Sequence, residues 1–255
     1  MSKEFLPTIL KQKEQEVAAM SYEELQPLRS TYSLYEYLKS YPQELQLIAE
    51  VKKASPSLGD INLGVDIVEQ ARTYERWGAA MISVLTDEIF FKGHLDYLRE
   101  ISSQVTIPNL NKDFIIDEKQ IVRARNAGAT VILLIVAALP EKRLQELYDF
   151  STGLGLEVLV ETHNLAELEI AHRIGAQIIG VNNRNLVTFE TDINTSLQLS
   201  AHFKDDRVYV SESAIFSKED AELVAPYFHA ILVGTSLMQA ENVAEKIKEL
   251  KIDKG

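Results

Sequence analysis

The amino-acid sequence predicts an α/β protein, a (β/α)8 TIM barrel with a helical N-terminal extension. Its 255 residues are close to the usual length of one such barrel. Apolar runs alternate with amphipathic segments, and a glycine-led motif opens such a run at Gly78, Gly128 and Gly175, with a weaker copy at His229. Each glycine can end a helix in the left-handed conformation. The spacing of roughly 50 residues, about two βα units, indicates a repeated architecture.

Before the first apolar run, Phe5, Ile9, Lys13 and Val17 recur at helical spacing, and a further segment covers residues 22–41. We expect residues 1–44 to form a helical N-terminal extension that covers one end of the barrel. No low-complexity linker divides the chain, so residues 1–255 are expected to form a single barrel domain.

Eight apolar runs have the length of strands, and amphipathic segments separate them. Strands that are buried on both faces and alternate with helices imply a parallel sheet, and eight of them imply closure into a barrel. An open doubly wound sheet is the alternative, but no Gly-x-Gly-x-x-Gly follows the first run. The predicted strands lie near residues 45–52, 81–86, 106–112, 131–137, 156–161, 178–182, 207–212 and 230–234.

Composition narrows the function. The net charge of −12, without any lysine- or arginine-rich block, disfavours nucleic acid and anionic membranes and favours a small-molecule substrate. The absence of cysteine excludes disulfides, thiolate zinc sites and cysteine nucleophiles, and the five histidines lack metal-ligand spacing. Residues 1–4 mix charged and apolar side chains, which is untypical of a signal peptide or membrane anchor, so we expect a cytoplasmic protein.

Charged residues end five of the eight runs, and active sites of these barrels lie at the C-terminal strand ends. Because side chains alternate along a strand, Ile48, Glu50 and Lys52 share one face. A single charged residue at a strand end is more often a solvated loop residue. Three carboxylates and two ammonium groups at the same end of one barrel would instead shift one another's pKa values apart, which would make both acids and bases available. The same alternation adds Lys112, Phe114, Glu161, Asn182, Arg184 and Glu212.

Other segments indicate how a ligand would be held. Phe91, Phe114 and Leu186 could form an apolar wall, although each alone is more typical of a core residue. The segments 211–214 and 233–236 follow the last two strands, where many barrels bind phosphate, although Thr235 or Ser236 could instead cap the last helix. The turn-rich segment 55–59 is a weaker signal.

These residues resemble one known family, the indole-3-glycerol phosphate synthases of tryptophan biosynthesis. The most specific match is the segment from Glu50 to Ser57, at the end of the first strand. The resemblance spans essentially the whole chain, and the order and spacing of the motifs also fit. Further matches are Lys112-Asp113-Phe114, Leu133 to Val136, Leu159-Val160-Glu161, Gly180 to Leu186, Ser211-Glu212-Ser213 and Gly234 to Met238.

The resemblance implies a carboxy-lyase that closes 1-(o-carboxyphenylamino)-1-deoxyribulose 5-phosphate to an indole, with loss of carbon dioxide and water and without a cofactor. Lys112 would be the general acid and Lys52 would hold the carboxylate. Glu161 would accept a proton in the dehydration, or Lys52 and Glu50 would share that work. The implied binding residues are Asn182, Arg184, Glu212 and Ser213 for polar groups, Ser55, Gly234 and Thr235 for phosphate, and Phe91, Phe114 and Leu186 for the aromatic ring.

The sequence departs from the family pattern at two positions. Ala214 stands where the family usually has glycine, and Thr235 where serine is common. A methyl group at Ala214 could narrow the approach to phosphate, and alanine is tolerable there if its φ is negative.

Two other functions remain open from the residues. A Schiff-base aldolase could use Lys52 or Lys112 as an amine nucleophile. A phosphate-binding barrel without catalytic activity is the second alternative. The sequence leaves the oligomeric state and any partner enzymes open.

Overall fold

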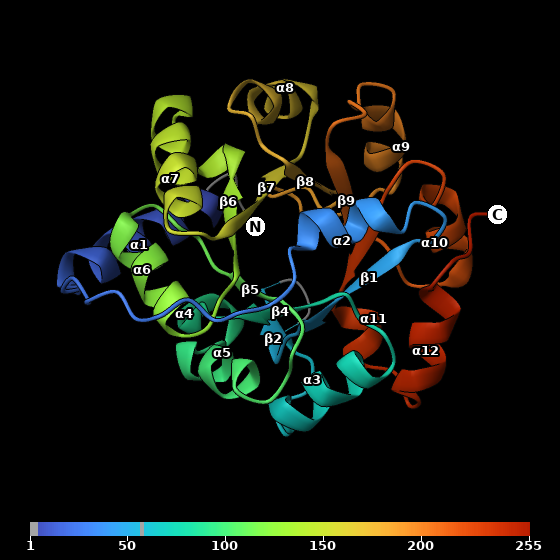
Figure 1. Cartoon of the computed structure of the whole chain (residues 1–255), viewed down its shortest axis with the longest axis horizontal. Coiled ribbons are helices and arrows are strands. Elements are labelled where there is room, and N and C mark those ends of the chain that lie inside the picture. Colours follow the sequence, from blue (N-terminus) through green and yellow to red (C-terminus); the bar gives the residue numbers. More distant parts are fainter. Residues whose placement is uncertain (1–4, 57–58) are drawn as a thin grey trace.

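The computed structural model describes residues 5–56 and 59–255, and its central feature is a closed ring of eight parallel strands surrounded by helices (Figure 1). The strands follow one another in the order β1-β10-β9-β8-β7-β6-β5-β4, and each pairs with its neighbours in parallel. This confirms the (β/α)8 barrel over an open sheet. The strands are β1 (Gln46–Val51), β4 (Met81–Leu85), β5 (Asn109–Lys112), β6 (Val131–Ile135), β7 (Glu157–Thr162), β8 (Ile178–Asn182), β9 (Val208–Glu212) and β10 (Ala230–Val233).

Several strands are shorter than the apolar runs that predicted them. The run 106–112 yields a strand only from Asn109, because Pro108 before it has no N–H to donate to a ladder. The run 131–137 ends as a 3₁₀ turn, η1 (Val136–Ala138). A short antiparallel pair, β2 (Ala54–Ser55) and β3 (Gly59–Asp60), lies in the turn-rich segment, of which Ser57 and Leu58 fall outside the described residues.

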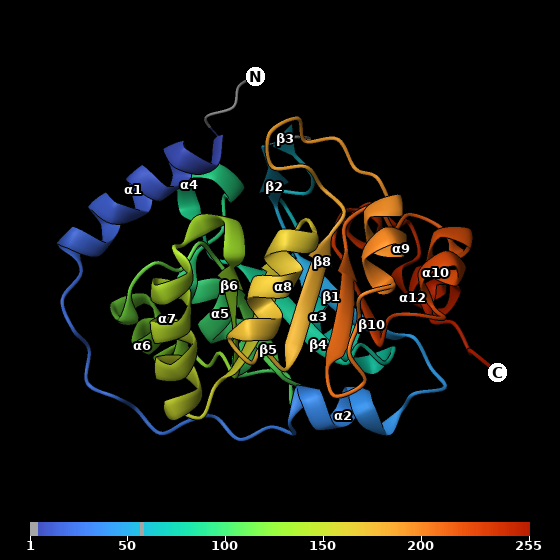
Figure 2. The same ribbon diagram turned by 90° about the horizontal axis from the view of Figure 1, so that it is seen from above.

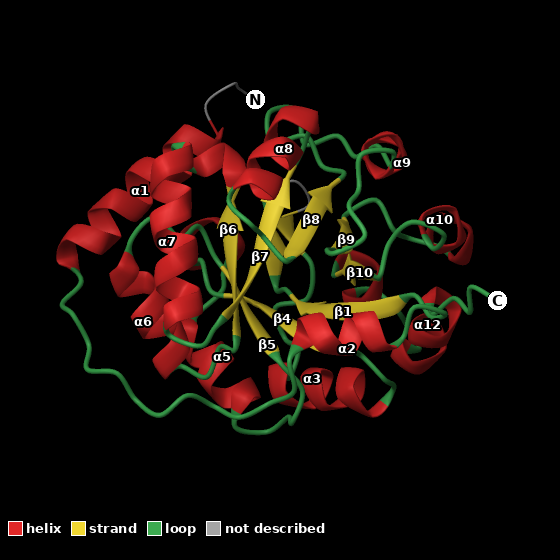
Figure 3. Ribbon diagram, turned by 45° about the horizontal axis from the view of Figure 1, so that its top comes forward, coloured by secondary structure: helices red, strands yellow, loops and turns green. Residues whose placement is uncertain are grey.

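Helices form the outer layer, between successive strands (Figure 3). Gly78, Gly128 and Gly175 follow three of them with φ of 89°, 98° and 77°, which confirms that these glycines end helices in the left-handed region. Within the described ranges, no helix combines the length and apolarity needed to cross a membrane. The helices are α3 (Ile67–Arg76), α4 (Glu88–Phe91), α5 (Leu95–Ser102), α6 (Glu118–Asn126), α7 (Glu141–Gly153), α8 (Leu165–Arg173), α9 (Asn194–Ser200), α10 (Lys218–Val224), α11 (Thr235–Met238) and α12 (Val243–Leu250).

The strands bury both faces. Ala49 and Val51 of β1 belong to the core between strands and helices, whereas Ile48 belongs to a second core inside the barrel. The inner core also holds Leu110 and Leu159, which the alternation placed on the same face as Lys112 and Glu161. The polar residues at the C-terminal strand ends therefore lie on the inner face of the barrel, directly beyond the residues of the inner core.

The N-terminal extension covers both ends of the barrel, where one end was expected. Helix α1 (Phe5–Ala19) lies on the side of α4 and β2, and α2 (Leu34–Ser40) lies across the opposite end (Figure 2). No helix forms between them, in residues 20–33. Leu34 and Leu38 pack into the inner core, and the Glu157 carboxylate accepts hydrogen bonds from the backbone N–H groups of Leu34 (2.7 Å) and Tyr35 (2.9 Å). This fixes the first turn of α2 against β7.

Candidate active site

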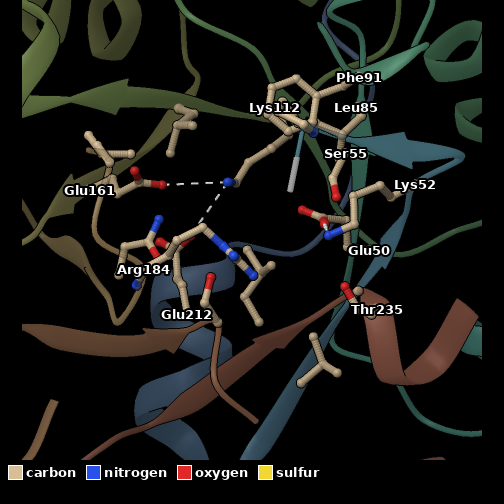
Figure 4. Close-up of a pocket in the computed structure, with 18 of the residues that line it drawn as sticks. Glu50, Lys52, Ser55, Leu85, Phe91, Lys112, Glu161, Arg184, Glu212 and Thr235 are labelled. Carbon is tan, nitrogen blue, oxygen red and sulfur yellow. Dashed lines mark hydrogen bonds and ion pairs between the residues drawn. The ribbon is translucent and has the colours of Figure 1, made fainter. Parts of the chain in front are cut away.

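A pocket opens at the C-terminal strand ends, and every residue that the sequence singled out for catalysis or binding lines it. Figure 4 shows part of this lining, with Lys112 between Glu161 and Glu212. The residues come from segments far apart in the chain, which the closed ring brings together. The four proposed catalytic residues and eleven proposed binding residues in this lining are Glu50, Lys52, Lys112, Glu161, Ser55, Phe91, Phe114, Asn182, Arg184, Leu186, Glu212, Ser213, Ala214, Gly234 and Thr235.

Lys112, at the end of β5, lies between two carboxylates. Its Nζ is 3.5 Å from Oε2 of Glu161 and 3.6 Å from Oε2 of Glu212. Burial alone would lower the pKa of Lys112, but the charges of Glu161, Glu212 and Glu50 outweigh burial and raise it. Lys112 is therefore held as an ammonium group, the form that can donate a proton.

The pKa values of the two carboxyl groups that face Lys112 are shifted in opposite directions. Burial would raise the pKa of Glu161, but the charge of Lys112 and contacts with His163 hold it below its usual range. Burial and the nearby charge of Glu161 raise the pKa of Glu212 to about 8. The ionised form is thus favoured for Glu161 and the protonated form for Glu212 near neutral pH, and such a separation allows one carboxyl group to accept a proton and the other to donate one.

Gly180 makes room for Glu212. A Cβ atom on Gly180 would lie 2.0 Å from Oε1 of Glu212, closer than real Cβ contacts allow. The glycine of β8 therefore lets the Glu212 side chain cross towards Lys112 from β9.

Glu50 and Lys52, both on the inner face of β1, form an ion pair with 2.9 Å between Oε1 and Nζ. Burial would raise the pKa of Glu50, but the charges of Lys52 and Lys112 lower it. A Cβ on Gly234 would lie 2.5 Å from Oε1 of Glu50, so the absence of a side chain at Gly234 leaves room for the Glu50–Lys52 pair next to the loop after β10. The arrangement leaves the Lys52 ammonium beside the loop that would receive an anionic ligand.

The loop after β9 has an unusual backbone. Ser213 and Ala214 have φ of 64° and 61°, so the condition that alanine be tolerated at negative φ is not met. Alanine is strained in this left-handed conformation, which glycine adopts freely.

The loop after β10 also differs from one expectation. Neither Thr235 nor Ser236 caps the last helix, because the Asn242 side chain does so by accepting from the N–H of Glu245 at 3.2 Å. Gly234 precedes α11 and makes no side-chain cap, and the Ser236 hydroxyl donates to the carbonyl of Ile215. The side chain of Thr235 instead lines the pocket.

Replacing Ala214 by glycine should stabilise the protein. The change removes strain of about 1–2 kcal/mol and restores backbone entropy of about 0.4–1 kcal/mol to the unfolded chain, so a net gain of roughly 0.5–1 kcal/mol is expected. Urea unfolding measures it. Ala201→Gly is the matched control, because φ there is −64° and the same change should destabilise. A loss of stability in both variants would contradict this account.

An aromatic wall faces the charged residues. The rings of Phe91 and Phe114 lie 6.1 Å apart, and Leu186 lines the same pocket. The sequence reasoning missed Phe5, whose ring packs 4.7 Å from that of Phe189 and closes part of the mouth from α1. The helical spacing placed Phe5 on a helix, but no signal indicated which end of the barrel that helix would cover.

A buried ion cluster attaches α1 beside the pocket, and the sequence reasoning missed it. Nζ of Lys13, which is 2% exposed, lies 2.8 Å from Oδ2 of Asp87 and 2.9 Å from Oδ1 of Asp113. Burial would lower the pKa of Lys13, but the charges of Asp113 and Asp87 raise it. Asp113 directly follows Lys112, so the cluster joins α1 to the strand end that carries the buried ammonium group.

Comparison with known proteins agrees with the motifs. The family model described as "Indole-3-glycerol phosphate synthase" matches residues 6–250. A Streptococcus sanguinis protein named indole-3-glycerol phosphate synthase is 96% identical, and one of the same name from Streptococcus mutans is 75% identical. Both alignments cover 100% of this chain and 100% of the relative.

Solved structures with low sequence identity share the barrel. A 3-hexulose-6-phosphate synthase aligns with a TM-score of 0.63 at 14% identity, covering 81% of this chain and 98% of that one. A thiamine phosphate pyrophosphorylase from Pyrococcus furiosus aligns with a TM-score of 0.57 at 18% identity, covering 81% and 93%. These likenesses concern the fold alone. Because the family model matches residues 6–250 and the named relatives align over the full length, the chain belongs to the indole-3-glycerol phosphate synthase family.

Proposed function

We propose that the protein catalyses the closure of 1-(o-carboxyphenylamino)-1-deoxyribulose 5-phosphate to indole-3-glycerol phosphate, a carboxy-lyase reaction of tryptophan biosynthesis. The observation that carries the proposal is the position of the Lys112 ammonium between Glu161 and Glu212, in a pocket that also holds the Glu50–Lys52 pair. The full-length relatives that carry the name of this activity support it. The finer assignments below are part of the same proposal.

Ring closure needs an acid. The aromatic carbon that bears the carboxylate attacks the ketose carbonyl, a C–C bond forms, and the carbonyl oxygen takes a proton from Lys112. Carbon dioxide then leaves, and the electron pair of its bond restores the aromatic ring. Lys52 holds the carboxylate near the attacking carbon until that step, and the Phe91 and Phe114 rings hold the aromatic ring in place.

Dehydration needs an acid and a base. The new hydroxyl leaves as water with a proton supplied from the pocket, and the adjacent CH₂ group loses a proton as the indole double bond forms. Glu161, ionised and facing the pocket, is the base of this step, and Glu212, whose pKa of about 8 keeps it protonated at neutral pH, can supply a proton. Glu50 stays paired with Lys52 in this scheme.

The other groups position the substrate. All of these residues line the pocket, and we assign Ser55, Gly234 and Thr235 to the phosphate and Asn182, Arg184, Ser213 and Leu186 to the rest of the substrate. No cofactor is required by this chemistry, and we propose that the enzyme works in the cytoplasm on its small phosphorylated substrate, without nucleic acid or membrane partners.

An indole-fluorescence assay tests the function. The purified protein is incubated with the carboxyphenylamino sugar phosphate without added metal or nucleotide, and we expect formation of the indole product. If no indole product forms at any of the enzyme concentrations tested, the proposal is rejected. Protein that has been heat-denatured controls for spontaneous ring closure.

The aldolase alternative has less support from the pocket. A Schiff-base lysine must be a neutral amine before it attacks the substrate, whereas the carboxylates raise the pKa of Lys112 and hold it as an ammonium group until a substrate oxygen takes its proton. Borohydride added with the substrate should therefore trap no adduct, and a trapped adduct on Lys112 or Lys52 would favour the aldolase.

A further inference from the structure

His163 lies behind Glu161 and bridges two carboxylates. Its Nε2 is 3.2 Å from Oε1 of Glu161, and its Nδ1 is 3.0 Å from Oε2 of Glu167. The His163 side chain is only 11% exposed. A neutral imidazole has one N–H, whereas the imidazolium has an N–H on each nitrogen and a positive charge, so only the charged form can hydrogen-bond Glu167 through Nδ1 and still present an N–H to Glu161 in an ion pair.

Glu167, the partner of His163 on the side away from Glu161, is held by several hydrogen bonds. Asn164 caps α8: its side chain accepts from the N–H of Glu167 at 3.0 Å and donates to Oε1 of Glu167 at 2.6 Å. The backbone N–H of His163 donates to Oε2 of the same carboxylate at 2.8 Å. Glu167 is thereby fixed at the first turn of α8, and it fixes the orientation of the His163 ring.

Glu161 and Glu212 compete for protons within the pocket. Both face Lys112 and both are almost fully buried. Once Lys112 gives its proton to the substrate, it no longer supplies a positive charge, and the proton held by this pair of buried carboxyl groups could lie on either Glu161 or Glu212. Among the ion pairs of the described residues, Glu161 has a second cationic partner in His163, whereas Glu212 pairs with Lys112 alone.

We propose that His163 is a positioning residue that keeps Glu161 ionised through the reaction and leaves the shared proton on Glu212. The inference rests on the proposed function, in which Lys112 donates its proton before Glu161 accepts one. His163 itself contacts no substrate in this scheme and acts through Glu161.

The charges around the bridge agree with this role. Burial would lower the pKa of His163, but Glu161 and Glu167 raise it to about 10, so the imidazolium persists at neutral pH. The groups facing Glu161 are Lys112 on β5, Asn182 on β8, Glu212 on β9 and His163. The cavity on the outer side of His163 is also lined by the charged residues Arg184, Glu190 and Asp192.

The test is the pH dependence of kcat in His163→Gln, whose amide can hydrogen-bond without carrying a charge. Without the imidazolium, Glu161 should take up a proton at a higher pH, so the acid limb should shift upwards by roughly one to two pH units. We expect kcat of His163→Gln to be about tenfold below wild type at the acid end of the profile, near pH 5, and to approach the wild-type value between about pH 7 and 8, where Glu212 can still hold its proton, while KM changes by less than about threefold. His202→Gln, at an exposed histidine, is the matched control and should keep the wild-type profile.

A second measurement determines the charge of the His163 ring and does not depend on enzymatic activity. In ¹⁵N NMR spectra, both ring nitrogens of His163 should remain protonated up to about pH 8 or above. A neutral ring at pH 7, or an equal loss of kcat at every pH in His163→Gln, would overturn the inference and leave a structural role. Wild-type protein without turnover would instead reject the proposed function, and the NMR titration would still decide the charge of His163.

Discussion

Replacing Lys112 by methionine should lower kcat by about 10²–10⁴, the usual contribution of general acid catalysis, while KM changes by less than about tenfold. Methionine retains the apolar stem and removes the ammonium group that lies 3.5 Å from Glu161 and 3.6 Å from Glu212. The substrate keeps its carboxylate and phosphate contacts with other residues, so binding is expected to suffer less than the chemical step. Steady-state kinetics of indole formation measure both constants.

Lys112→Arg separates proton donation from charge. A guanidinium group carries the positive charge but cannot give up its proton in the working pH range. We therefore expect kcat of Lys112→Arg to be nearly as low as that of the methionine variant. Lys142→Met, at a side chain that is 91% exposed, is the control and should be fully active. Substantial turnover by Lys112→Arg would show that Lys112 acts through its charge alone.

The sequence predicted the barrel and its inner face because both follow from short-range rules. Alternation along a strand placed Ile48, Glu50 and Lys52 on one face, and the structure puts Ile48 in the inner core with Glu50 and Lys52 paired above it. Closure of the ring then brings residues such as Lys112 and Glu161 together, although 49 positions separate them. Periodicity and closure were sufficient for this part of the site.

Contacts that depend on docking or on local backbone conformation could not be predicted in this way. Lys13 occupied an apolar position of a helical pattern, and nothing in that pattern indicates that it meets Asp87 and Asp113. The left-handed conformation of Ala214 contradicts the usual preference of alanine and is imposed by the surrounding loop. His163 belonged to no recognisable motif, because its partners are Glu161 two positions before it and Glu167 at a helix start.

Lys13→Met should cause the largest loss of stability among these variants. Removing the cation leaves the carboxylates of Asp87 and Asp113 close together without compensation, and breaking a buried ion pair in this way costs about 3–5 kcal/mol. Since α1 packs over the mouth through Phe5, the helix should detach and KM should rise. Hydrogen exchange of the α1 amides, thermal unfolding and steady-state kinetics measure the three effects.

Two further variants distinguish an ionic anchor from general packing of α1. Lys11→Met, at an exposed position of the same helix, should leave the thermal midpoint and KM near wild type. Adding Asp87→Asn and Asp113→Asn to Lys13→Met should recover part of the lost stability, because the cost arises from uncompensated carboxylates and both amides can still hydrogen-bond. A triple variant less stable than Lys13→Met alone would contradict this account. The carboxylates would then stabilise the protein even without Lys13, and the attachment of α1 would have to come from packing of the Lys13 stem beside Ile9.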